Sequence, residues 1–269
     1  MLDIQNQPDY RNISIDKVGI KGLKYPIKVL DKTSEVQSTI ADINMYVDLP
    51  HQCKGTHMSR FVEILHLFKS KVSLESLTNI LGDMKKTLGA KSSHIEISFA
   101  YFIEKKSPQT KSKGLMHYTC SIIGSSNVSQ NADIILKVAV PVTSVCPCSK
   151  EISEHGAHNQ RGEVLVSTRF KKLIWIEDIV NIVESCASCD IFSVLKREDE
   201  KFVTEKAYNN PKFVEDIVRD VSKILIEDKN ILWFSVSAEN FESIHNHSAY
   251  AYIEKNTQCQ KENLARHYF

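Results

Sequence analysis

The connection from Val142 to Val164, VTSVCPCSKEISEHGAHNQRGEV, gathers side chains that bind metal ions in proteins. It carries the cysteines Cys146 and Cys148 and the histidines His155 and His158. A catalytic zinc site typically takes three protein ligands from Cys, His, Asp and Glu and leaves one position for water. The spacing is not that of a standard zinc knuckle, so a polar loop with incidental thiols is the alternative. A metal site here therefore requires ligands from elsewhere in the chain.

Two later polar connections, 186–210 and 239–248, are rich in the same residue types. Their candidate ligands are Glu198, Asp199, Glu200, Glu242, His245 and His247. The pair Cys186 and Cys189 has the spacing of a redox motif, but it follows an expected helix, whereas the thioredoxin motif opens one. We therefore interpret these two cysteines as incidental.

The hydrophobic period predicts the elements that position these connections. In the first half we expect strands at 15–29, 40–49, 95–101 and 116–123 and helices at 58–68 and 74–84, the second capped by Ser73. In the second half we expect strands at 134–142, 164–170, 232–238 and 248–253 and helices at 176–183 and 214–225, the latter started by Asn210 and Pro211. The polar stretch 124–133 joins the halves. The expected fold is α+β: two ββααββ modules, 1–128 and 129–269, with antiparallel sheets and helices on one face.

This topology predicts where the polar connections lie. If the first strand of the second module runs upward, the connection 142–164 lies at its top. The following elements alternate in direction, so the connections 186–210 and 239–248 end at the top as well. Loops on a rigid scaffold are where chemistry usually takes place. The convergence favours an open, catalytic metal site over an incidental loop.

Composition and charge exclude several functional classes. The chain has 269 residues, 42% hydrophobic and 25% charged, with a formal net charge of +1, which gives no electrostatic reason to expect nucleic acid or an anionic membrane as a partner. No apolar run approaches the roughly 20 residues that span a bilayer. The polar start MLDIQNQPDY lacks a signal-peptide pattern, and seven scattered cysteines do not suggest a disulfide framework. We expect a cytoplasmic protein.

The basic run 104–114 lacks aromatic residues that would stack bases, so we expect a solvated turn.

Four segments of this chain resemble the signature segments of the type IB GTP cyclohydrolases. They are KGTHMSRF, PVTSVCPCSKEISEHGAHNQRGEV, VLKREDEKFVTEKAYNNPKFVEDIVRD and ENFESIHNHSAYA, which lie in the same order along most of the chain. The resemblance implies the bimodular tunnelling fold, assembled as a homotetramer with active sites at subunit interfaces. It also implies a reaction in which GTP and water give formate and 7,8-dihydroneopterin triphosphate, the first step toward tetrahydrofolate.

The resemblance also implies roles for individual residues. The expected metal ligands are Cys146, His158 and Glu200, with Glu242 and His245 as further or alternative ligands. Cys148, His155 and His247 are candidates for proton transfer during ring opening. The mixed sulfur, nitrogen and oxygen set suits zinc, manganese or iron.

Substrate-binding residues follow from the same resemblance. Tunnelling-fold enzymes hold their purine or pterin ring with a carboxylate on the second helix, and Glu215 has that position. By residue type alone it is a solvated helix carboxylate. For the triphosphate we expect contributions from a set of basic side chains without ranking them: His57, Arg60, Lys150, Arg161, Lys196, Arg197 and Lys206.

Three alternatives remain at this level. An archaeal-type cyclohydrolase would give a cyclic phosphate product from the same chemistry. A nitrile reductase of queuosine synthesis shares the fold, but its typical E-[SL]-K-[SA]-x-K segment is absent from this sequence. A catalytically dead scaffold of the same fold is the third, although Cys, His and Glu are present in all three connections.

Overall fold

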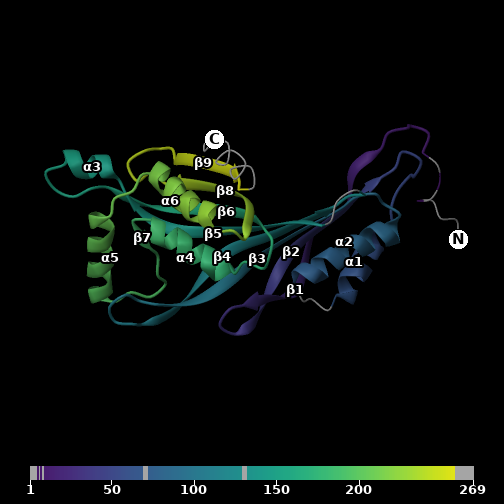
Figure 1. The fold of residues 1–269 in the computed structure, drawn as a ribbon. Coiled ribbons are helices and arrows are strands. Elements are labelled where there is room, and N and C mark those ends of the chain that lie inside the picture. Colours follow the sequence, from purple (N-terminus) through teal and green to yellow (C-terminus); the bar gives the residue numbers. More distant parts are fainter. Residues whose placement is uncertain (1–4, 6, 8, 69–71, 129–131, 258–269) are drawn as a thin grey trace, which may run out of the picture. The chain divides into compact units, whose positions relative to one another are not determined.

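The computed structural model describes residues 5, 7, 9–68, 72–128 and 132–257. Within these residues the chain forms an antiparallel sheet of nine strands in the order β1-β2-β3-β4-β5-β6-β8-β9, with β7 paired to β5 (Figure 1). The strands are β1 (Ile15–Asp31), β2 (Glu35–Leu49), β3 (Ser93–Lys106), β4 (Lys113–Ser126), β5 (Asp133–Val145), β6 (Asn159–Phe170), β7 (Cys189–Asp190), β8 (Ile231–Asn240) and β9 (Ala249–Asn256). The helices are α1 (Met58–Leu67), α2 (Leu74–Leu88), α3 (Pro147–Ile152), α4 (Ile176–Cys186), α5 (Arg197–Asn209) and α6 (Val214–Glu227).

The residue contacts divide the chain into two compact units. The first contains residues up to Ala100 together with Cys120–Leu136, and the second contains Tyr101–Thr119 and the chain from Lys137 onward. The division passes through β3, β4 and β5, so each of these strands contributes residues to both units. These units have other boundaries than the predicted modules 1–128 and 129–269, which remain a prediction.

Alternation along β2 and β3 builds the core of the first unit. Ile43 pairs with Ile97 and Met45 with Ile95, and all four side chains are buried. Apolar residues at every second position of a strand share one face, so both strands present this face to α1 and α2. Helix α2 begins at the predicted cap, because Ser73 Oγ accepts a hydrogen bond from the Ser76 N–H at 3.1 Å.

The second unit repeats this construction with different residues. Val166 on β6 pairs with Val236 on β8, and both are buried. The buried positions of α6 recur at helical spacing and pack toward these strands: Val214, Ile217, Val218, Val221, Ser222 and Leu225. In both units, an apolar strand face and an apolar helix stripe together account for the core.

The connection 186–210 differs from the sequence expectation. It contains helix α5, and α6 begins at Val214 with Phe213 as its N-cap, so the predicted start at Asn210 and Pro211 was wrong. The Phe213 N–H donates to Asp216 Oδ2 at 3.0 Å, which satisfies an otherwise unpaired helix N–H. Asn210 instead closes α5, and its Nδ2 donates to the Ala187 carbonyl at 2.9 Å.

Among the described residues, none of the helices combines the length and the apolar character needed to cross a membrane.

Candidate active site

The Cys/His connection folds back on itself between β5 and β6. Cys146 is the N-cap of the short helix α3, and its Sγ accepts from the Ser149 N–H at 3.4 Å. The Cys146 N–H donates to the His158 carbonyl at 3.1 Å, which brings the two ends of the connection together. Gly156 turns the chain with φ +77°, a conformation that side chains with a Cβ rarely adopt. Local hydrogen bonding therefore places Cys146 beside His158.

His158 lies next to a residue of the third connection. Its Nδ1 lies 3.7 Å from Glu242 Oε2, and both side chains are 14% exposed. Glu242 follows the end of β8, which pairs with β6, so the sheet register carries the two residues to the same end. Two of the three predicted connections therefore meet in the structure.

A pocket in the second unit joins this pair to helix α6. Its lining includes Cys146, Gln160, Lys212, Glu215, Asn240 and Glu242. Glu215 lies in the first turn of α6, and the Lys212 N–H donates to the Val145 carbonyl at 3.0 Å, which ties the start of this segment to the end of β5. The predicted purine anchor and two predicted metal ligands thus line one pocket.

The other predicted ligands lie elsewhere. Glu200 is exposed in the first turn of α5, and it is not among the residues that line this pocket. His245 and His247 are exposed in the β8–β9 turn, where their rings stack with centroids 5.0 Å apart. Among the described residues, no three His, Cys, Asp or Glu side chains are arranged to hold a metal ion. The full ligand set stays a prediction.

The remaining candidates divide between the two units. Cys148 on α3 and His155 in the loop are exposed. Lys150 Nζ donates to the Tyr208 carbonyl at 2.6 Å and lies 4.3 Å from the centroid of the Tyr208 ring. Arg161 is exposed on β6. Two candidates belong to the first unit. His57 is the N-cap of α1, and Arg60 Nη1 donates to the Thr87 carbonyl at 3.1 Å.

Cys146 and Glu242 in the pocket, together with His158 beside Glu242, have the donor chemistry that a divalent transition metal takes. Cysteine sulfur, histidine nitrogen and glutamate oxygen are all ligands of zinc in proteins, and a histidine ligand usually has its other ring nitrogen hydrogen-bonded. His158 meets this condition, because its Nδ1 lies 2.9 Å from Gln160 Oε1. Pattern analysis missed Gln160, Lys212 and Asn240. A single polar residue in a strand or loop gives no sequence signal of its own.

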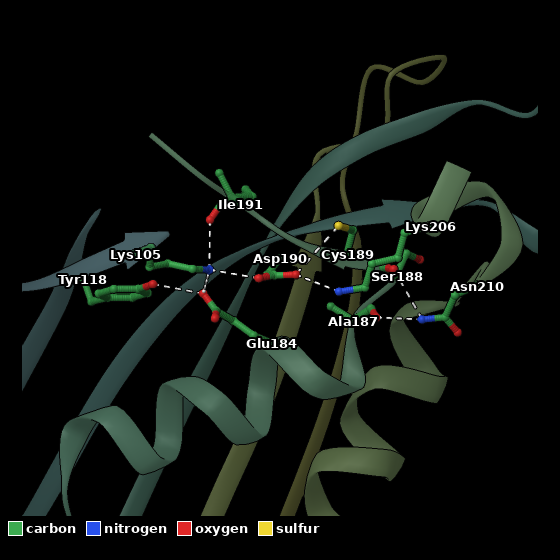
Figure 2. Close-up of polar contacts among 10 residues, drawn as sticks. All are labelled: Lys105, Tyr118, Glu184, Ala187, Ser188, Cys189, Asp190, Ile191, Lys206 and Asn210. Carbon is green, nitrogen blue, oxygen red and sulfur yellow. Dashed lines mark hydrogen bonds and ion pairs between the residues drawn. The ribbon is translucent and has the colours of Figure 1, made fainter. Parts of the chain in front are cut away.

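The same unit contains a network of charged side chains with little exposure to solvent (Figure 2). Lys105 Nζ contacts Glu184 Oε1 at 2.8 Å, Asp190 Oδ2 at 3.1 Å and the Ile191 carbonyl at 3.0 Å. Tyr118 Oη donates to the same Glu184 oxygen at 2.9 Å. These contacts link β3, β4, α4 and β7.

Burial sets the proton affinities in this network. It raises the pKa of Glu184, and Lys105 only partly opposes the shift. Burial raises the pKa of Tyr118 as well, with the charge of Glu184 adding to the effect, and it raises the pKa of Cys189 to about 11. Burial would also raise the pKa of Asp190, but hydrogen bonds and charges from Lys206 and Lys105 outweigh it and lower that pKa. A thiol with a raised pKa stays protonated and is a weaker nucleophile than a thiolate.

Asp199 binds the β3–β4 turn to the start of α5. Its Oδ1 accepts from the Gln109 and Thr110 N–H groups at 2.8 and 2.9 Å, and its Oδ2 accepts from Thr110 Oγ1 at 2.6 Å and the Lys196 N–H at 3.0 Å. Burial would raise the pKa of this carboxyl, but these hydrogen bonds hold it well below its ordinary value. Asp199, which is 0% exposed, therefore attaches the basic turn to α5. From the sequence we expected a solvated turn.

Comparison with known proteins identifies close relatives. The model of the family "Type I GTP cyclohydrolase folE2" matches residues 1–251. GTP cyclohydrolase FolE2 of Desulfosudis oleivorans is 60% identical over 253 residues, which cover 94% of this chain and 97% of the relative. GTP cyclohydrolase FolE2 of Syntrophobacter fumaroxidans is 56% identical over 255 residues, which cover 95% and 99% of the two chains.

Solved structures of low identity share the fold. A uricase from Bacillus fastidious superposes with a TM-score of 0.54 at 9% identity, covering 94% of this chain and 95% of the uricase. The urate oxidase of Bacillus sp. TB-90 gives a TM-score of 0.53 at 8% identity, covering 90% and 99%. At such identity the likeness concerns the fold alone. The predicted tunnelling fold, with an antiparallel sheet and helices on one face, is confirmed.

Proposed function

The chain belongs to the type I GTP cyclohydrolase FolE2 family, and we propose that it converts GTP and water to formate and 7,8-dihydroneopterin triphosphate. Relatives with this name match nearly the whole chain, and they do not favour the cyclic-phosphate or nitrile reductase alternatives. A first step toward tetrahydrofolate is the corresponding biosynthetic role.

One observation carries the assignment to a site: Cys146, Glu215 and Glu242 line a single pocket. Guanine presents its N1–H and its 2-amino group along one edge, and one carboxylate accepts from both. Glu215 is proposed to hold this edge. With the purine held there, Cys146 and Glu242, which line the same pocket, are proposed to act where the imidazole ring is opened.

A divalent ion, zinc, manganese or iron, is part of the proposal. Cys146, His158 and Glu200 would hold it, with Glu242 and His245 as further or alternative ligands. When bound, such an ion supplies a Lewis acid that makes water nucleophilic near neutral pH. Glu200 and His245 lie on an exposed helix turn and an exposed hairpin, so completing this set requires α5 or the β8–β9 turn to approach the pocket.

Further side chains of the same unit are proposed to transfer protons and to bind the triphosphate. Cys148, His155 and His247 are proposed to deliver protons to the ring nitrogens as formate leaves. Lys150 and Arg161 are proposed to bind the triphosphate, and Lys150 would exchange its contact with the Tyr208 carbonyl for a phosphate oxygen. His57 and Arg60 belong to the first unit and are proposed to contribute from a neighbouring subunit.

The proposed assembly is a cytoplasmic homotetramer. Among the described residues, β1 and β9 are the two end strands of the sheet, so each leaves an edge that can pair with another chain. Exposed Tyr250 and Tyr252 lie on β9 and offer apolar area to such a partner. Active sites between subunits would then receive residues from both units.

Formate release from GTP, measured together with metal content, tests this function. The metal-loaded protein is expected to release formate and to lose that activity when a chelator removes the ion. Cys146→Ala is expected to lower both metal content and rate, whereas Cys53→Ala, a half-buried thiol of the first unit, leaves both unchanged. A metal-loaded protein that releases no formate from GTP would overturn the proposal.

A further inference from the structure

Gln160 lines the pocket and contacts two of the proposed metal ligands. It is the second residue of β6 and is 8% exposed. Its Oε1 lies 2.9 Å from His158 Nδ1, and its Nε2 lies 3.4 Å from Glu242 Oε1. The amide therefore stands between an imidazole and a carboxylate, with one of its two ends toward each.

The bonding partners of the amide determine its orientation. A carboxylate only accepts hydrogen bonds, so the amide NH₂ must face Glu242 and the amide oxygen must face His158. A second contact agrees, because Gln160 Nε2 also lies 3.4 Å from Ser144 Oγ. The Ser144 hydroxyl donates its only proton to the Lys212 carbonyl at 3.1 Å, so it accepts from Gln160.

This orientation also determines the protonation of the histidine ring. An amide oxygen only accepts, so His158 Nδ1 must carry the hydrogen, and in the neutral ring Nε2 then has the free lone pair. A neutral imidazole with its second nitrogen donating to an oxygen is the form in which histidine binds a metal. Glu242 Oε2 lies 3.7 Å from His158 Nδ1, beyond hydrogen-bond distance, so without the amide this nitrogen loses the acceptor that selects the tautomer.

We propose that Gln160 is a positioning residue that holds His158 in its Nδ1–H tautomer, with Nε2 available to a divalent ion, and keeps Glu242 beside it as a second ligand. The metal part of this inference rests on the proposed function. The tautomer is a property of the metal-free chain. Asn240 extends the support across β8, since its Nδ2 donates to the same Ser144 hydroxyl at 2.9 Å.

Three variants separate the contributions of the amide. Gln160→Met has similar length but no N–H donor and no strong acceptor, so both contacts are lost. Gln160→Glu keeps an acceptor for His158 Nδ1 but cannot donate to Glu242. Asn210→Ala is the control, because it removes another amide of the same unit, which bonds the Ala187 and Ser188 carbonyls and is not among the residues that line the pocket.

The test has two readouts on the full-length protein. The first is the tautomer of His158 in the metal-free protein, read from ring ¹⁵N chemical shifts at a pH where the ring is neutral. Wild type, Gln160→Glu and Asn210→Ala are expected to show Nδ1–H, and Gln160→Met a mixture of tautomers. The second is zinc affinity, measured by competition with a chromophoric chelator. Gln160→Met is expected to bind zinc about 10–100-fold more weakly than wild type or Asn210→Ala.

The outcomes distinguish this inference from the proposed function. A wild-type protein with the Nε2–H tautomer would overturn the inference, as would a folded Gln160→Met that keeps both the wild-type tautomer and the wild-type zinc affinity. A wild-type protein that shows Nδ1–H in a Gln160-dependent way but binds no metal would support the positioning role and overturn the metal centre. Circular dichroism checks that each variant is folded.

Discussion

Lys105 and Glu184 form a buried ion pair, with Nζ 2.8 Å from Oε1 and side chains that are 13% and 11% exposed. Asp190 completes the arrangement at 3.1 Å from the same nitrogen. Removing one partner of a buried pair is costly because it leaves an uncompensated charge in surroundings of low polarity. Removing a single partner of this network should therefore destabilise the segment that leads to α5.

Lys105→Met is expected to lower the free energy of unfolding by about 3 kcal/mol at pH 7.5. The loss should be smaller at pH 5. Burial already raises the pKa of Glu184, and without Lys105 it rises further, so this carboxyl takes up a proton more readily at pH 5 than at pH 7.5 and then carries no unpaired charge. For a carboxyl with a raised folded pKa, stability falls as pH rises toward that pKa. Urea unfolding at the two pH values measures the difference.

Lys201→Met is the matched control for this variant. Lys201 makes an exposed pair with Glu205 at 3.9 Å, and such pairs contribute about 0.5 kcal/mol or less. An equal loss of stability in Lys105→Met and Lys201→Met would contradict the importance of the buried network.

Asp199→Asn is expected to lower the melting temperature, because an amide places a donor among groups that all donate. The pKa of Asp199 lies well below its ordinary value in the folded chain, so its contribution is complete above the unfolded value of about 3.9 and is lost as the pH falls below it. The gap between wild type and variant should therefore narrow between pH 5 and pH 3 in thermal scans. A gap that stays constant over this range would show that the carboxylate charge is not what binds the turn.

Glu200→Ala is expected to reduce bound metal and GTP turnover together, since Glu200 is the ligand proposed from α5. Glu198→Ala is the control, because Glu198 is an exposed carboxylate in the same first helical turn and should leave metal content unchanged. The metal content of both purified variants is measured by elemental analysis. Full metal loading and full activity in Glu200→Ala would remove this residue from the ligand set.

The assembled protein is expected to have four times the chain mass of 30.6 kDa in light scattering at micromolar concentration. Replacing Tyr252 on β9 with Lys places charge on the exposed edge strand and should shift the mass toward smaller species and reduce formate release in parallel. An active monomer would contradict a site built from more than one subunit.

Alternating and helical periodicity of apolar residues predicted the strands and core helices, because the positions that become buried on folding carry apolar side chains. Ile43 and Met45 are apolar since they face their helices, and that pattern is visible in any single sequence. Helix α5 has no such pattern: its buried residues are Asp199 and Ala207. Polar contacts through Asp199 hold it, and a pattern based on hydrophobicity cannot detect a helix of this kind.

The sequence predicted the part of the site that depends on the order and direction of the strands and helices. The alternating directions of strands and helices predicted that the connections of Cys146 and Glu242 meet, and both residues line one pocket, whereas Glu215 was expected to bind the purine only from the family resemblance. Gln160 was not predictable, because its role depends on which atoms face its two ends. The start of α6 was mispredicted because Asn210 and Pro211 form a common helix-start pair, whereas Asp216 caps the Phe213 N–H further along.

The most direct test of the account is formate release from GTP by Glu215→Gln, compared with Glu227→Gln on the same helix. Glutamine keeps the size of Glu215 but replaces an acceptor with a donor, so we expect a loss of roughly 2–4 kcal/mol in transition-state binding, with metal content unchanged. Glu227→Gln, an exposed carboxylate at the far end of α6, should release formate like the wild type. If kcat/KM for GTP is the same in Glu215→Gln and wild type, the pocket lined by Cys146, Glu215 and Glu242 is not where the purine is held.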